Sequence, residues 1–159
     1  MILTVTNAVK ACGRIVVVAL VLHGTLLGKL LAQQGDIDVG TESPVAGVTF
    51  RFIQSNGITM RIAETGTGPL VLLAHGWPES WYSWRHQMTM LADAGYHVVA
   101  PDMRGYGETD KPAAVDDYNI NHVAGDLVGI LDALGEETAI LVGHDWGAII
   151  VWNMAMIHR

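Results

Sequence analysis

The sequence predicts an α/β protein with a mostly parallel sheet, helices on both faces and an antiparallel hairpin at its N-terminal side. From residue 70 onward, short apolar runs alternate with longer segments whose apolar residues follow helical spacing. This alternation is typical of strand–helix repeats around a parallel sheet. Upstream, Asn56-Gly57 separates two strand-like segments, and Asn-Gly is the strongest short signal for a hairpin.

Each element has a local signal. The residues flanking Asn56-Gly57 predict the two hairpin strands, and continuous apolar runs indicate strands covered on both faces. The strands are therefore expected at 49–55, 58–65, 70–74, 97–100 and 138–142. Caps and stops predict helices from about Trp84 to Ala94 after Ser80 or Ser83, from Asn119 or Asn121 to Gly135, and from about Gly147 onward.

The chain divides into three regions by composition. Residues 1–32 form an apolar, signal-like or anchoring segment, residues 33–47 a polar linker, and residues 48–159 the body. All sixteen acidic residues follow residue 32, while three of the nine basic residues precede it. An acidic body argues against nucleic acid as a partner. The single cysteine, Cys12, excludes an internal disulfide framework.

The N-terminal segment resembles a secretory signal. Lys10 and Arg14 precede an apolar run beginning at Ile15, as in the positive and hydrophobic regions of such signals. Export or anchoring, with membrane contact through residues 15–31, is the favoured interpretation. Lys29 and the poor cleavage pattern at Leu30-Leu31-Ala32 weaken it, so a cytoplasmic protein with a wrongly assigned start codon is the alternative.

The most informative motif is Gly143-His144-Asp145-Trp146-Gly147, directly after the apolar run at 138–142. It matches the G-x-nucleophile-x-G elbow with Asp in place of Ser. A carboxylate is already ionised at neutral pH and attacks without a base. Asp145 therefore suits displacement at a saturated carbon of an epoxide or a carbon–halogen bond. An Asp that merely caps the following helix is the alternative reading of this motif alone.

A second motif, His75-Gly76-Trp77-Pro78, follows the strand at 70–74. Proteins with a nucleophile elbow place half of their oxyanion hole in a loop of this kind. We expect the backbone amides of Trp77 and Trp146 to be the oxyanion donors, and a turn with a stacked Trp is the alternative. His75 is expected to be a hydrogen-bonding scaffold residue. No second histidine lies at ligand spacing from it, so we expect neither a metal site nor a cofactor.

Three motifs in order carry a family resemblance. They are His75 to Arg85 (HGWPESWYSWR), Asp102 to Pro112 (DMRGYGETDKP) and Gly143 to Ala148 (GHDWGA). They resemble the epoxide hydrolase branch of the α/β-hydrolase fold, over about residues 48–159. The resemblance implies that Asp145 is the nucleophile, that Trp77 and Trp146 supply oxyanion amides, and that Pro78 is cis. It implies a small-molecule epoxide and water as partners. Arg104 and Asp110 are then structural, and Tyr82 and Tyr106 are not ring-opening tyrosines.

The sequence departs from that family because it stops at Arg159, after the elbow and its helix. In the family, two cap tyrosines, a late acid and a histidine follow, so we expect the 159-residue chain to be a fragment that does not turn over alone. His122 and His158 are poorly placed to replace that histidine, and the His144 side chain should alternate away from the pocket. We also expect the strand at 138–142 to be a bare sheet edge that promotes self-association.

Two other functions remain open. A haloalkane or haloacid dehalogenase of the same fold also uses an Asp nucleophile followed by Trp, but haloalkane dehalogenases commonly have Asn at the position of Trp77. A non-catalytic truncated product is the third hypothesis. His75, Gly76, Pro78, Gly143, His144 and Gly147 form the predicted scaffold of the site under the first two hypotheses.

Overall fold

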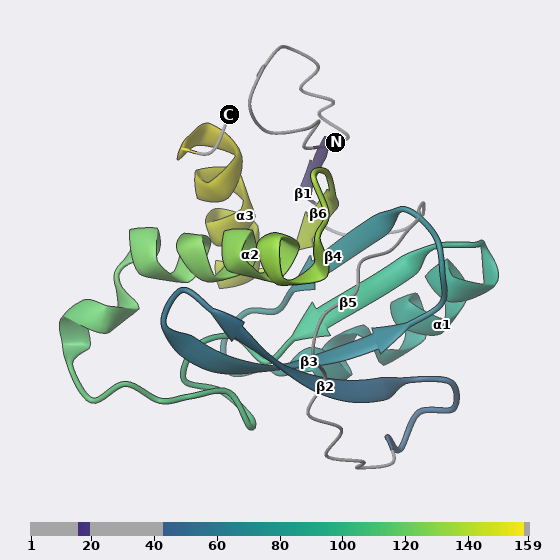
Figure 1. Cartoon of the computed structure of the whole chain (residues 1–159), viewed down its shortest axis with the longest axis horizontal. Coiled ribbons are helices and arrows are strands. Elements are labelled where there is room, and N and C mark those ends of the chain that lie inside the picture. The colour runs from purple at the N-terminus through teal and green to yellow at the C-terminus, as the bar shows by residue number, and fades with distance from the viewer. Residues whose placement is uncertain (1–15, 20–42, 158–159) are drawn as a thin grey trace.

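A six-stranded sheet forms the centre of the molecule in the computed structural model, which describes residues 16–19 and 43–157. The strand order is β1-β6-β4-β5-β3-β2 (Figure 1). The strands are β1 (Val16–Ala19), β2 (Thr49–Ser55), β3 (Ile58–Thr65), β4 (Leu70–Ala74), β5 (His97–Pro101) and β6 (Ile140–Gly143). The strands β1, β6, β4 and β5 run parallel, whereas β3 and β2 are antiparallel to their neighbours. The predicted sheet is thereby confirmed.

The N-terminal hairpin forms around Asn56-Gly57, as predicted. Asn56 and Gly57 both have positive φ angles, 46° and 80°, which gives the turn the twist that suits a two-residue hairpin. Ser55 then pairs with Ile58, and the ladder continues to Thr49 and Glu64. The hairpin lies at one edge of the sheet and extends it beyond the parallel strands (Figure 1).

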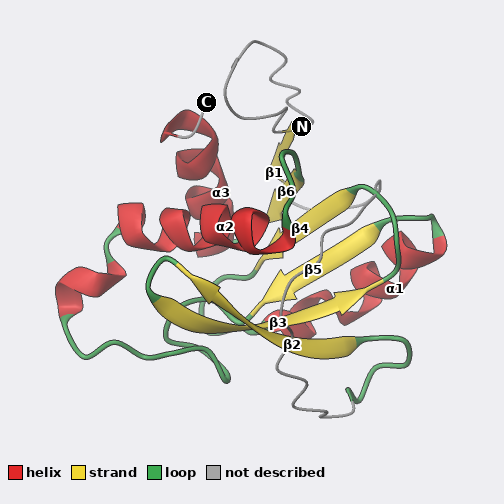
Figure 2. Cartoon of the chain, in the orientation of Figure 1, coloured by secondary structure: helices red, strands yellow, loops and turns green. Residues whose placement is uncertain are grey.

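The central strand β4 is buried on both faces, as its unbroken apolar run predicted. Leu72 and Ala74 belong to a core cluster with α2 (Ile120–Leu134) and α3 (Trp146–Ile157). Val71 and Leu73 belong to a second cluster with α1 (Arg85–Asp93). Successive side chains of a strand point to opposite faces, so the helices cover the sheet from two sides, α2 and α3 on one and α1 on the other (Figure 2).

The helix boundaries agree with the caps, with one correction. Asn119 caps α2 by accepting the amides of Asn121 and His122, and Gly135 ends it with a φ of 70°. The predicted helix at 84–94 is shorter. Ser80 caps a 3-10 turn, η1 (Trp81–Trp84), and α1 begins only at Arg85. A second 3-10 turn, η2 (Val115–Tyr118), lies in the connection between β5 and α2.

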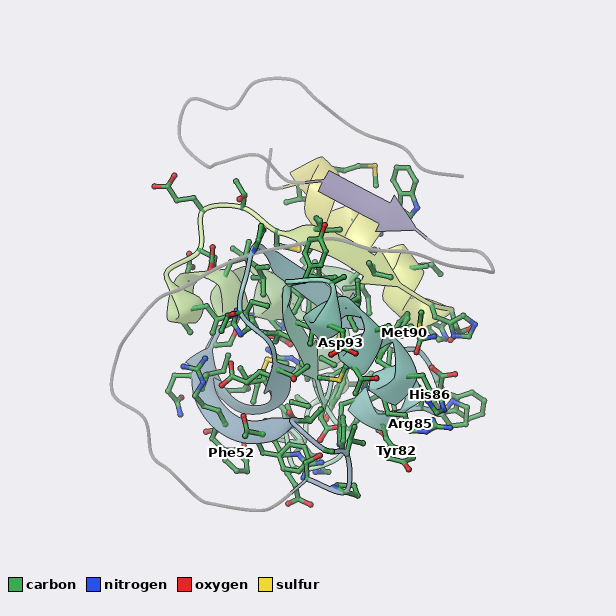
Figure 3. All side chains as sticks on the ribbon, turned by 90° about the vertical axis from the view of Figure 1, so that its right-hand side faces the viewer. Phe52, Tyr82, Arg85, His86, Met90 and Asp93 are labelled. Carbon is green, nitrogen blue, oxygen red and sulfur yellow. The ribbon has the colours of Figure 1, made fainter. Side chains whose placement is uncertain are left out.

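Helix α1 turns one face to solvent beside Tyr82. The Tyr82 ring is 43% exposed, and the Arg85 guanidinium lies over it at 4.6 Å from the ring centroid. Figure 3 shows both residues with His86, Met90 and Asp93 on this side of the molecule. The expectation that Tyr82 is not a ring-opening tyrosine stays a prediction.

The edge beside β6 differs from the prediction. β6 was expected to be a bare edge, but β1 pairs with it in parallel from Val16↔Ile140 to Ala19↔Gly143. That prediction is wrong for this structure, because a strand from the apolar N-terminal segment takes the outer position. The rest of the predicted 1–32 segment and the linker up to residue 42 lie outside the described residues. In the part that is described, no helix has the length and apolar character to cross a bilayer.

Candidate active site

Three loops meet at the carboxyl ends of the parallel strands, which is where open α/β sheets bind ligands. Ala74 pairs with Gly143 at the ends of β4 and β6, and the His144 amide donates to the Ala74 carbonyl at 3.2 Å. The loop after β5 joins them, because the Met103 amide donates to the His75 ring at 3.0 Å. The three motifs of the sequence thus form one site.

The elbow after β6 has the strained geometry that its two glycines predict. Asp145 has a φ of 53°, a left-handed value that few non-glycine residues adopt. A Cβ on Gly143 would collide with the Gly147 carbonyl, and a Cβ on Gly147 would collide with the Ala74 carbonyl. The glycines therefore let strand, turn and α3 approach closely enough to hold Asp145 at the apex.

The Asp145 carboxylate lies directly on the loop after β4. Trp77 N–H donates to Asp145 Oδ1 at 3.0 Å, and a Cβ on Gly76 would lie within 2.5 Å of the same oxygen. Trp77 and Pro78 are joined by a cis peptide bond, as the resemblance implied. The backbone amides of Trp77 and Trp146, and to a smaller extent His144, hold the pKa of Asp145 below its ordinary value. The carboxylate is therefore ionised at neutral pH.

The two tryptophans meet Asp145 through their backbones, while their side chains face solvent. The Trp77 side chain is 67% exposed and that of Trp146 is 57% exposed. Asp145 is exposed as well. The arrangement offers an ionised carboxylate, two amides directed at it and an open, aromatic approach to it. It suits attack on a carbon followed by stabilisation of negative charge on the carboxylate oxygen.

His75 lies beneath this site as a buried link between loops. Its side chain is 1% exposed. Nδ1 is 2.8 Å from the Gly76 carbonyl oxygen, and Nε2 accepts the Met103 amide. The Tyr106 ring meets the imidazole edge-on, with centroids 5.0 Å apart. Burial lowers the pKa of His75, although the Gly76 carbonyl and the charges of Asp102 and Glu79 act in the opposite direction.

This depressed pKa of His75 predicts a pH dependence of stability. Below about pH 6.5 the unfolded chain binds a proton on this histidine that the folded protein does not. The contribution of neutral His75 to the free energy of unfolding is therefore fully present above that pH, and it is lost as the pH drops toward the folded-state pKa of His75. We expect urea midpoints at pH 7.5 and pH 5.0 to differ less in His75→Gln than in wild type. The control His86→Gln, at an exposed histidine, should keep the wild-type difference between the two urea midpoints. A wild-type difference in His75→Gln would contradict the assignment of this pH dependence to His75.

His144 and His122, two further histidines in the part of the chain that the structure describes, are both exposed. The His144 ring is 54% exposed and pairs with Glu79, Nδ1 to Oε1, at 3.5 Å. Its expected orientation away from the pocket stays a prediction. His122 is exposed on α2, and His158 lies outside the described residues. No group of three metal-ligating side chains occurs in residues 16–19 and 43–157.

The loop from Asp102 to Pro112 is held by its charged residues. Arg104 forms a two-point salt bridge with Asp126 of α2, at 2.8 Å and 2.6 Å, and both residues are buried. Asp110 accepts the Thr59 amide at 2.7 Å and so fastens the loop to β3. Asp102, fully buried, accepts from Arg61. Arg104 and Asp110 thus have the structural positions that the resemblance implied.

Sequence reasoning missed three contributors to the site. Asp126 is one of the few acidic residues buried within the described part, and Asn56 also donates to it. Met103 contributes through its backbone amide, which no sequence pattern indicates. Tyr106 touches His75, and burial together with the nearby charge of Asp145 raises its pKa. None of the three had a signal in the sequence, because the burial of Arg104, and with it the need for an acidic partner, becomes visible only in the structure.

With this geometry established, comparison with known proteins identifies the class. A family model described as alpha/beta hydrolase fold matches residues 69–159, which is more than half of the chain. The chain therefore belongs to the α/β-hydrolase fold family. Within that family, its similarities support the epoxide hydrolase branch.

Three relatives illustrate this. Epoxide hydrolase 3 of Siraitia grosvenorii is 62% identical over 104 residues, covering 65% of this chain and 33% of the relative. Epoxide hydrolase A of Mycobacterium tuberculosis (strain ATCC 25618 / H37Rv) is 54% identical over 112 residues, covering 69% of this chain and 35% of the relative. The crystal structure of an epoxide hydrolase from Vigna radiata superimposes with a TM-score of 0.71 at 46% identity, covering 73% of this chain and 38% of the chain in that structure. The chain thus spans about a third of the length of these curated relatives.

Proposed function

We propose that this chain carries the nucleophile and oxyanion hole of an epoxide hydrolase. The observation that carries the proposal is the Asp145 carboxylate at the apex of a strained elbow, with Oδ1 on the Trp77 amide. The similarity to proteins named epoxide hydrolases supports the substrate class. The absence of a serine at the apex argues against ordinary ester hydrolysis.

In the first step, the carboxylate oxygen that is not held by Trp77 attacks one epoxide carbon. The new C–O bond forms as the ring C–O bond breaks, and the ring oxygen leaves as an alkoxide that takes a proton from solvent water, which leaves hydroxide. The product is a 2-hydroxyalkyl ester of Asp145. Before the attack, the lowered pKa of the Asp145 carboxyl group keeps this side chain ionised.

In the second step, water attacks the ester carbonyl carbon, Cγ of Asp145. Negative charge then develops on Oδ1, which already lies 3.0 Å from the Trp77 amide. A donor of this kind contributes about 3–4 kcal/mol to such a step. Collapse of the intermediate releases the diol and regenerates the carboxylate. We assign the proton transfers to no residue of the described part, because both nitrogens of His75 are engaged and His144 faces Glu79.

The test is intact-mass spectrometry of the chain after incubation with styrene oxide or with 1-bromobutane. An epoxide adduct adds the full mass of the reagent, because ring opening expels no atom. We expect one adduct per chain with styrene oxide and none with 1-bromobutane. Addition of a butyl group with release of bromide would instead favour the dehalogenase. Unmodified protein in both arms would favour the non-catalytic product.

A further inference from the structure

Three hydrogen-bond donors in series lead from the loop after β5 to the carboxylate of Asp145. The Met103 amide donates to His75 Nε2 at 3.0 Å. An N–H donor requires an acceptor, so Nε2 has no proton, and the proton of the neutral ring is on Nδ1. Nδ1–H then donates to the Gly76 carbonyl oxygen at 2.8 Å. The partners of the ring thus determine its tautomer.

The carbonyl that His75 holds belongs to the same peptide unit as the N–H that holds the nucleophile. The Gly76 C=O and the Trp77 N–H are two ends of one planar amide, and Trp77 N–H donates to Asp145 Oδ1 at 3.0 Å. Fixing the carbonyl therefore fixes the direction of the N–H. The Glu79 amide is a second donor to the same carbonyl, at 3.1 Å, so the peptide unit is held from two sides.

We propose that His75 is a positioning residue that aims the Trp77 amide at Asp145 through the Gly76–Trp77 peptide unit. The chain of donors runs from Met103 through the imidazole and the peptide to the carboxylate, and hydrogen bonds in such a chain strengthen one another. The Tyr106 ring packs against the imidazole in a T-shaped arrangement and supports its position. This assignment rests on the proposed function, in which the Trp77 amide is an oxyanion donor, and adds the residue that orients it.

Protonation of His75 would interrupt the chain. Nε2–H would then face the Met103 N–H, donor against donor, and the ring would have to move. The charged groups that face His75 are Asp102 from the loop after β5 and Glu79 from the loop after β4, and both favour the protonated form. Burial among Met103, Tyr106 and Gly76 opposes them and keeps the ring neutral.

The test follows the Asp145 carboxyl and the Trp77 amide by NMR during a pH titration, in three variants. In His75→Leu, which keeps bulk but no hydrogen bond, we expect the titration midpoint of Asp145 to rise and the Trp77 amide signal to shift. His75→Gln retains a donor and an acceptor and should restore both toward wild type. His86→Leu, at an exposed histidine on α1, should change neither. A folded His75→Leu with an unchanged Asp145 midpoint would overturn the proposal.

A measurement on the wild type decides the matter if His75→Leu does not fold. Imidazole nitrogen shifts should show the proton on Nδ1, and the Trp77 amide should move in the same pH step in which His75 becomes protonated. The proposal would be overturned by a proton on Nε2, or by a Trp77 amide signal that does not shift when His75 becomes protonated. None of these readouts involves an epoxide, so they are independent of the adduct experiment that tests the function.

Discussion

Asp145→Asn should abolish the covalent epoxide adduct. The asparagine side chain fits the same elbow and can still accept the Trp77 amide, but it is uncharged and its amide is a poor nucleophile. Removing an essential nucleophile lowers a rate by on the order of 10⁴-fold or more. We therefore expect intact-mass spectrometry to show no epoxide adduct on this variant over times that modify the wild type completely.

The control for this experiment is Asp132→Asn. Asp132 is an exposed acid on α2, so the substitution removes the same charge away from the elbow. It should form the adduct at the wild-type rate. If Asp145→Asn still acquired one epoxide per chain at that rate, another residue would be the nucleophile and the proposed chemistry would be wrong.

Asp126→Ala should be the most destabilising single change among the charged residues of the fold. Arg104 would lose both of its bonds to the carboxylate, at 2.8 Å and 2.6 Å, and would remain as an unpaired buried charge. Removing one partner of a buried pair costs about 3–5 kcal/mol. Arg104 belongs to the loop that presents Met103 to His75, so we expect the substitution to disturb the candidate site as well. The loss of unfolding free energy is measured by urea unfolding followed by fluorescence.

Two comparisons sharpen that prediction. Asp132→Ala, on the solvent side of the same helix, should change the unfolding free energy by about 0.5 kcal/mol at most. The double variant Arg104→Met/Asp126→Leu should be more stable than Asp126→Ala alone, because no buried charge is left without a partner. A double variant less stable than Asp126→Ala would contradict this account of the loop.

The parts of the fold that the sequence predicted are those with local causes. Asn56 and Gly57 make their turn through their own backbone preferences, and the run from Leu70 to Ala74 is apolar because both faces are covered. The elbow was predictable because Gly143 and Gly147 are required by close approach within a few residues. The cis bond at Pro78 came from the family resemblance, not from a pattern in the chain.

The features that escaped prediction depend on residues far apart in the sequence. β1 pairs with β6 across more than a hundred residues, and nothing local distinguishes an apolar strand at Val16–Ala19 from part of a signal segment. Asp126 is an acid among helical apolar residues and resembles a solvent-facing one, until Arg104 reaches it across the fold. The Met103 amide is a backbone group, so its role beneath His75 becomes visible only in three dimensions.

The central claim is that Asp145 becomes an ester. The most direct test is to digest the styrene oxide-treated chain and locate the added mass by tandem mass spectrometry, before and after mild alkali. The account predicts a 2-hydroxyalkyl group on Asp145 that hydroxide removes, because it is held by an ester bond. An alkali-stable label on Cys12, on a histidine such as His144 or on a methionine, with Asp145 unmodified, would contradict it.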